Sequence, residues 1–145
     1  MTTINPYLTF SGNCEEAFNY YKTVFGGSFD TISRFAEMPP QEGVSLSEED
    51  KNKIMHVSLP ISAETVLMGS DTGGAWAPDT IMGNNFSLSV SVESIDKAKD
   101  IFNKLSAGGQ VTMPLEKTFW SDSFGMCTDK FGINWMVSFS EPNQN

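Results

Sequence analysis

The chain has 145 residues, 39% of them hydrophobic and 12% aromatic, which is enough to bury a core as a single folded domain. Its 18 acidic residues outweigh 9 basic ones and give a net charge of -9, which argues against binding to nucleic acid or to an anionic membrane surface. No apolar run approaches the roughly 18 residues of a membrane span, and the N-terminus does not resemble a signal peptide. We therefore expect a cytoplasmic protein.

Two cysteines, Cys14 and Cys127, are too few for a disulfide framework in a chain of this size. We interpret both as small, buried hydrophobic residues of a protein in a reducing compartment. A thiolate is favoured near a helix N-terminus, so a nucleophilic role for Cys14 is the less favoured alternative.

The first half of the chain predicts one helix among four strands. The helix begins at Asn13, a residue suited to an N-cap, with Glu16 three positions on as in a capping box. Its apolar stripe recurs at helical spacing and ends at a glycine pair. The predicted strands cover residues 6–10, 29–35, 54–60 and 65–68.

A long irregular stretch, residues 36–53, separates the second strand from the third. Pro39 and Pro40 block regular structure, and Ser47 is a candidate cap for a short turn through residues 48–50. A loop of this length in a compact domain is usually functional or mobile, so a lid and a plain surface insertion both remain open.

The second half repeats the pattern of the first. Residues 86–92 alternate, with Phe86, Leu88, Val90 and Val92 on one face and serines on the other. Ser94 is an N-cap candidate for a helix that ends at Gly108-Gly109, and residues 111–115 predict a strand. A hairpin completes the half, with strands at 124–128 and 133–139 around the turn Asp129–Gly132.

This order is β-α-β-β-β written twice, and it predicts an α+β fold. We expect one domain over residues 1–145, with modules at about 4–71 and 84–139 joined by a linker. One such module leaves a curved, mixed sheet with a helix on one face and nothing on the other. We expect the helices on the outer faces, the bare faces around a cleft, and a homodimer.

The residues resemble the vicinal-oxygen-chelate superfamily of glyoxalases, bleomycin-resistance proteins and extradiol dioxygenases, and more closely its PhnB-like branch. The matching stretches are PYLTFSGNCEEAFNYYKTVFGG, IMHVSL, LMGSD, the helix into LSAGG and VTMPLEKTFWSDSFGMCTDKFGINWMV. The resemblance implies paired βαβββ modules, commonly as homodimers. Some members of the branch carry a demethylubiquinone methyltransferase label, but this sequence has no glycine-rich strand-to-helix turn of the nucleotide-binding kind.

Metal-dependent members of the superfamily place His, Gln or Glu side chains on the first and last strands of each module. Serine, threonine, asparagine and apolar residues stand at those places here, and His56 is the only histidine in the chain. Because a zinc, iron or nickel site needs three or four N, O or S ligands, we expect no metal and no other cofactor.

Two residues are candidates for catalysis. His56 is the only imidazole and would act as a general base, although a lone histidine on an apolar strand is more often structural. Asp71 follows the fourth strand, where the cleft should open, and its structural alternative is to cap the turn at Thr72-Gly73.

Aromatic residues are candidates for the wall of a ligand pocket, each with core packing as its alternative. Core packing is the stronger interpretation for Trp135 and the weaker one for Trp120, which lies where a loop meets a strand. The predicted pocket residues are Trp120, Phe119, Phe124, Trp76, Ser87 and Ser89.

These patterns favour a protein that binds a small molecule, with or without turnover, and they leave open whether it is an enzyme. The first alternative is a non-catalytic, drug-sequestering protein. The second is a divalent-metal lyase or dioxygenase with unusual ligands.

Overall fold

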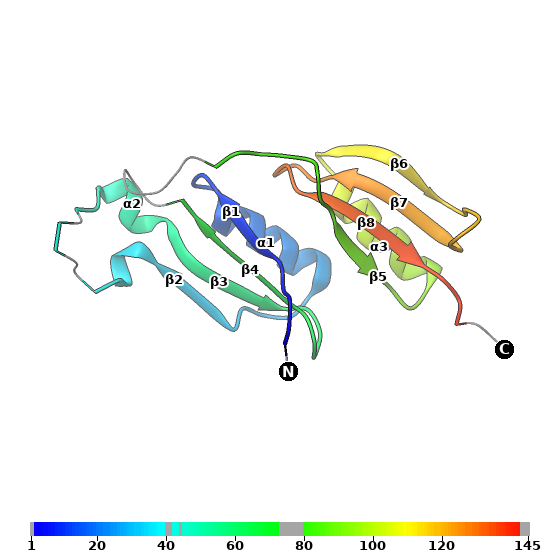
Figure 1. The fold of residues 1–145 in the computed structure, drawn as a ribbon, viewed down its shortest axis with the longest axis horizontal. Helices are drawn as coiled ribbons and strands as arrows, with labels where there is room; N and C mark the ends of the chain where they lie inside the picture. Colours follow the sequence, from blue (N-terminus) through cyan, green and yellow to red (C-terminus); the bar gives the residue numbers. More distant parts are fainter. Residues whose placement is uncertain (1, 40–41, 44, 73–79, 143–145) are drawn as a thin grey trace. The chain divides into compact units, whose positions relative to one another are not determined.

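A computed structural model describes residues 2–39, 42–43, 45–72 and 80–142. The chain forms two compact units, Met1–Ile81 and Met82–Asn145, which we call the first unit and the second unit. Figure 1 shows one four-stranded sheet and one long helix in each. Trp76, predicted to line a pocket, lies outside the described residues. Among the described residues, no helix is long and apolar enough to cross a membrane.

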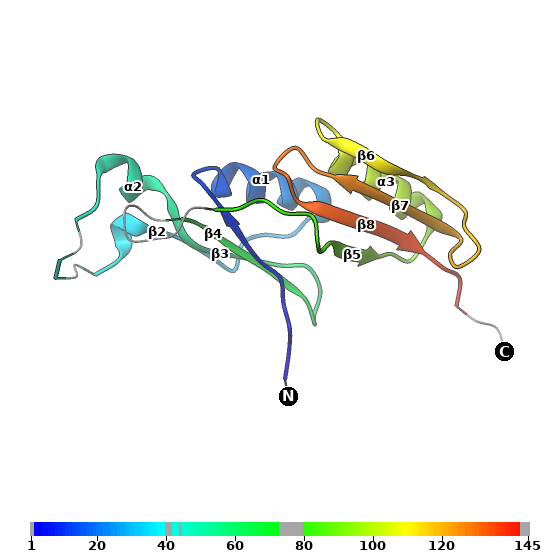
Figure 2. The same ribbon diagram turned by 45° about the horizontal axis from the view of Figure 1, so that its top comes forward.

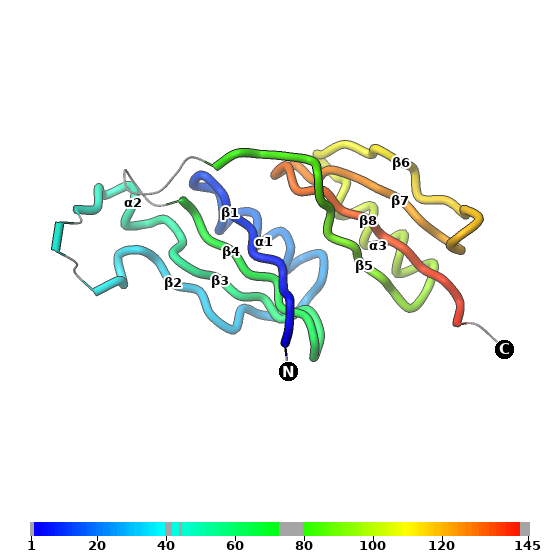
Figure 3. The backbone as a smooth tube through the Cα atoms, viewed as in Figure 1, coloured from blue at the N-terminus to red at the C-terminus, as the bar shows by residue number. Residues whose placement is uncertain are grey.

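The first unit follows the predicted order, with two short helical turns added in the long connection. Its sheet has the strand order β1-β4-β3-β2, in which β1 runs parallel to β4 and the other neighbours are antiparallel. Figure 3 shows β1 running alongside β4, although about 60 residues separate them along the chain. The elements are β1 (Tyr7–Phe10), α1 (Cys14–Phe25), β2 (Thr31–Arg34), η1 (Phe35–Glu37), α2 (Glu48–Asn52), β3 (Ile54–Pro60) and β4 (Val66–Asp71).

The second unit has the same topology. Its strand order is β5-β8-β7-β6, again with a parallel first pair and antiparallel neighbours after it. The elements are β5 (Leu88–Ser91), α3 (Ile95–Ser106), β6 (Gln110–Glu116), β7 (Ser123–Thr128) and β8 (Asn134–Phe139). The predicted α+β fold of two βαβββ modules with mixed sheets is therefore confirmed.

Each long helix covers one face of its own sheet, as Figure 2 shows. In the first unit Phe18 of α1 packs onto β4 at Gly69, where an added Cβ would lie 2.6 Å from the phenyl ring. In the second unit Phe102 of α3 packs onto β7 at Gly125, where an added Cβ would lie 2.9 Å from the ring. Glycine is needed at both positions because the helix side chain occupies the space of a Cβ. The opposite face of each sheet is not covered by its helix, and we call it the uncovered face.

Two local predictions need correction. The strand predicted over residues 86–92 spans only Leu88–Ser91, so Phe86 and Val92 lie outside it, and Phe86 is 61% exposed. Asn13 occupies the N-cap position of α1, but its side chain makes no capping hydrogen bond. The other two predicted caps are confirmed, because the Ser47 and Ser94 hydroxyls accept hydrogen bonds from the N–H groups of Asp50 and Lys97.

Candidate functional site

A row of methionines crosses the uncovered face of the second sheet. Met136 of β8 pairs with Met126 of β7, and Met126 pairs with Met113 of β6. Ser89 of β5 pairs with Met136 and completes the row. Directly paired residues point to the same face, and these alternate with residues that pack toward α3, such as Gly125 and Val137. The three methionines are half-buried and Ser89 is exposed. The predicted role of Ser89 as a pocket residue stays a prediction.

An aromatic cluster of Phe119, Trp120 and Phe124 lies beside this row. The Trp120 ring meets Phe119 and Phe124 edge-on, with ring centroids 4.7 and 5.4 Å apart. Phe124 belongs to β7, two residues before Met126, so it shares the uncovered face. Trp120 is 52% exposed and Phe119 is 97% exposed. Three of the predicted pocket residues thus form one contiguous apolar surface in contact with solvent.

The loop that carries Phe119 and Trp120 is anchored to the sheet by Ser121. The buried Ser121 hydroxyl lies 2.8 Å from the carbonyl oxygens of Ser123 and Phe139. The backbone carbonyl of Ser121 accepts a hydrogen bond from the N–H of Thr118. These contacts fix the loop to β7 and β8, so the backbone that carries Phe119 and Trp120 is held in place. Ser87, another predicted pocket residue, is half-buried just ahead of β5.

Trp135 belongs to the core, as its strand position indicated. It is 3% exposed, and its indole N–H donates a hydrogen bond of 2.8 Å to the buried carboxylate of Asp129. The same carboxylate accepts hydrogen bonds from the backbone N–H groups of Phe131 and Ile133. Asp129 therefore closes the β7–β8 turn and holds the tryptophan of the following strand.

His56 lies on the uncovered face of the first sheet, beside Tyr7. The neighbouring residue, Val57, pairs with Gly69 on the face that α1 covers, so His56 points to the opposite face. The two rings stack with centroids 5.8 Å apart, and the Tyr7 hydroxyl lies 3.4 Å from Nδ1 of His56. Tyr7 was not among the predicted site residues. Tyr7 is exposed beside the buried Leu8 on β1, and its contact with His56 crosses 49 residues of sequence, so no local pattern indicated the pair.

The Asp71 carboxylate is buried and serves three backbone donors. One oxygen accepts hydrogen bonds from the N–H groups of Gly12 (2.9 Å) and Cys14 (3.0 Å), and the other accepts from Ile54 (2.9 Å). Asp71 therefore caps α1 in place of Asn13, and it joins the β1–α1 loop to the start of β3. The predicted catalytic role of Asp71 is untested. In the structure both carboxylate oxygens of Asp71 accept hydrogen bonds from backbone N–H groups.

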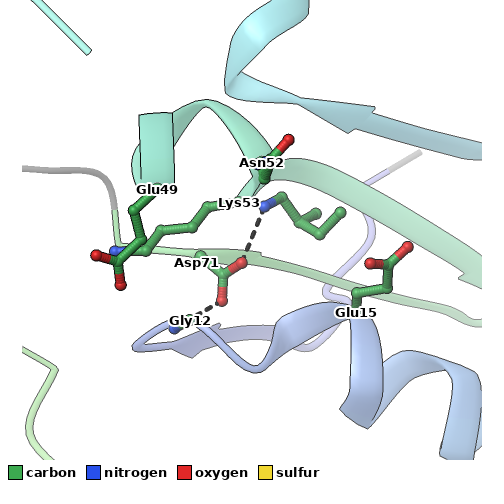
Figure 4. Close-up of a pocket in the computed structure, with 7 residues that line it drawn as sticks. Gly12, Glu15, Glu49, Asn52, Lys53 and Asp71 are labelled. Carbon is green, nitrogen blue, oxygen red and sulfur yellow. Dashed lines mark hydrogen bonds between the residues drawn. The ribbon is translucent and has the colours of Figure 1, made fainter. Parts of the chain in front are cut away.

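A shallow pocket of about 170 Å³ opens above Asp71 in the first unit. Figure 4 shows Glu15 and Glu49 on either side of it, with the Lys53 side chain extending toward Glu49. Glu15 pairs with Arg34, and Lys53 lies 2.9 Å from Asp50. The polar lining is therefore largely engaged in contacts with other parts of the same unit.

Neither cysteine has the environment of a nucleophile. Burial, and then the nearby Asp71 carboxylate, raise the pKa of the Cys14 thiol well above its ordinary value. Burial and Asp129 likewise raise the pKa of Cys127, to about 11. Both thiols are therefore protonated at neutral pH, which agrees with their interpretation as small buried hydrophobic residues.

Two four-stranded mixed sheets of identical strand order, each backed by one helix, define the glyoxalase class of fold. The domain of the glyoxylase, bleomycin resistance protein and dioxygenase class from Frankia sp. EAN1pec shares it, with a TM-score of 0.64 at 12% identity over 97% of each chain. The model of the 3-demethylubiquinone-9 3-methyltransferase family matches residues 2–138, and the chain belongs to this family.

Relatives with higher identity to this chain match it over nearly its whole length. Protein PA1353 from Pseudomonas aeruginosa is 41% identical, with a TM-score of 0.82 over 97% of this chain and 98% of its own. A putative 3-demethylubiquinone-9 3-methyltransferase, PhnB protein, from Bacillus cereus is 25% identical, with a TM-score of 0.74 over 96% and 100%. Protein YjdN of Escherichia coli K12 is 29% identical over 93% of both chains. The PhnB-like resemblance of the sequence is therefore confirmed.

Proposed function

We propose that this protein binds a small, largely apolar molecule on the uncovered face of its second sheet, against the aromatic cluster, and that it does so without a transition metal. The supporting observation is the exposure of Trp120 and Phe119 on a loop that Ser121 anchors. Large apolar groups gathered in contact with solvent commonly mark a binding surface. Aromatic rings offer a ligand much contact area at small entropic cost.

The methionine row would extend this surface. Thioether side chains are flexible and polarizable, so they adapt to ligands of different shape and make favourable contacts with aromatic rings. Such a surface suits either of two forms of the function, a binding protein that only sequesters its ligand and an enzyme that converts it. Turnover of a bound ligand is the measurement that separates them. The methyl transfer in the family's description is not part of the proposal, because the sequence has no glycine-rich strand-to-helix turn for a nucleotide-like cofactor.

Titration with Nile red, a neutral dye whose fluorescence rises in apolar surroundings, tests the surface. We expect saturable binding, and we expect Trp120→Ala to weaken it by about tenfold or more, since loss of a central aromatic contact costs well over 1 kcal/mol. Phe86→Ala is the matched control, because Phe86 is similarly exposed in the same unit and is not part of the aromatic cluster. If both substitutions weakened dye binding equally, or if neither weakened it, the result would count against the aromatic cluster as the binding surface.

We expect protein purified without chelator to contain far less than one zinc, nickel or iron per chain. Within the described residues, no group of three His, Cys, Asp or Glu side chains lies close enough to hold a metal ion. The buried Asp71 carboxylate already accepts three backbone hydrogen bonds. Elemental analysis is the measurement, and about one equivalent of any of these metals would contradict the proposal and favour the divalent-metal alternative.

We also propose that the protein is a homodimer, since each sheet has a face that its own helix does not cover. Light scattering should then give a mass of twice 15.9 kDa. A species of 15.9 kDa that persists at high micromolar concentration would show that the chain is monomeric.

A further inference from the structure

Tyr7 and His56 form a pair on the uncovered face of the first sheet. Their contact affects which ring nitrogen of His56 carries a proton. A neutral imidazole carries one proton, on either Nδ1 or Nε2, and the hydrogen bond made by one nitrogen decides which of the two is protonated. His56 is half-buried, and its Nδ1 faces the Tyr7 hydroxyl at 3.4 Å. The stacked arrangement of the two rings limits how far the imidazole can turn away from this contact.

We infer that the Tyr7 hydroxyl donates to Nδ1 of His56, which places the imidazole proton on Nε2 and makes His56 a hydrogen-bond donor for a ligand oxygen. A phenol is the natural donor in such a pair and an unprotonated ring nitrogen the natural acceptor. Tyr7 is a positioning residue in this arrangement, because it acts on a ligand through His56. The predicted general-base role is then disfavoured, because Nε2 is protonated and Nδ1 already accepts a hydrogen bond.

The ligand chemistry follows from the donor. A neutral Nε2–H group donates to an acceptor oxygen of the ligand, for example that of a carbonyl or a carboxylate. The neighbouring positions offer hydroxyl and thioether groups rather than a second titratable side chain. Ser33 pairs with His56 across β2 and β3, and Met68 pairs with Tyr7 across β4 and β1. His56 and Tyr7 belong to the first unit, whereas the aromatic cluster belongs to the second.

Nitrogen-15 NMR of the imidazole tests the tautomer directly, and a single histidine makes the assignment unambiguous. At a pH where the imidazole is neutral, we expect a protonated Nε2 and an unprotonated Nδ1. In Tyr7→Phe the ratio of the two tautomers should fall by about two- to tenfold, the factor expected for one net hydrogen bond. Tyr20→Phe is the control, because it removes a phenol hydroxyl from α1 on the other side of the sheet.

Three results would overturn the inference. They are a proton on Nδ1 in the unaltered protein, an unchanged ratio in Tyr7→Phe, and an equal change in Tyr20→Phe. Acetophenone and ethylbenzene, which have similar shapes, then test the ligand chemistry, since only acetophenone has an acceptor oxygen. A larger shift of the Nε2 resonance with acetophenone supports the donor role. Equal shifts, or no shift with either compound, count against it.

Discussion

Trp135→Ala should destabilise the protein by about 3–5 kcal/mol, the usual cost of deleting a large buried aromatic side chain. The indole is buried on the face of β8 that α3 covers, and its N–H donates a hydrogen bond to the Asp129 carboxylate. The substitution therefore leaves a cavity and removes a donor from a buried charge. Urea denaturation followed by circular dichroism measures the loss.

Trp120→Ala is the matched comparison within the same unit. Trp120 is half exposed, so its replacement should cost about 1 kcal/mol or less and leave a folded protein. Trp135→Phe separates the two contributions at the buried site, because it keeps an aromatic ring and removes the N–H donor. If Trp120→Ala unfolded as early as Trp135→Ala, Trp120 would belong to the core, and the binding surface would have to be sought elsewhere.

Asp71→Ala should be of comparable severity, with a loss of about 3–5 kcal/mol. The substitution leaves three N–H groups, those of Gly12, Cys14 and Ile54, without their acceptor, and each unsatisfied buried donor costs about 1–3 kcal/mol. Partial entry of water keeps the total below the simple sum. Urea denaturation again provides the measurement.

Asp122→Ala is the control for this prediction, since the Asp122 carboxylate accepts one backbone hydrogen bond at an exposed position. It should change the free energy of unfolding by less than about 1 kcal/mol. A loss in Asp71→Ala as small as that expected for Asp122→Ala would mean that the three hydrogen bonds to Asp71 contribute little to stability.

Elements with a local signal were predictable from the sequence. Apolar residues recur at helical spacing along α3, a pattern visible in the sequence, and all four of them are buried: Ala98, Ile101, Phe102 and Leu105. The turn at Asp129–Gly132 was predictable because aspartate and glycine favour turns, and Gly132 adopts the positive φ of 89° that glycine tolerates. Such features depend on residues only a few positions apart.

The candidate sites were only partly predictable, because their decisive contacts are distant in sequence. His56 and Asp71 were singled out, but the partners of Asp71 lie 59, 57 and 17 residues away. The methionine row depends on the register between strands, which alternation alone does not determine. For the same reason each residue of the aromatic cluster was predicted singly, whereas the methionine row beside the cluster was not predicted.

The different caps of the two long helices have a consequence for the order of folding. Ser94 caps α3 from within its own first turn, so this helix can form as soon as its own residues are available. The cap of α1 comes from Asp71, which reaches the N-terminus of the helix only after β4 has docked beside β1. Closing so long a loop costs entropy before the contact forms. We therefore expect the first unit to complete α1 late in folding, although α1 comes first in the sequence.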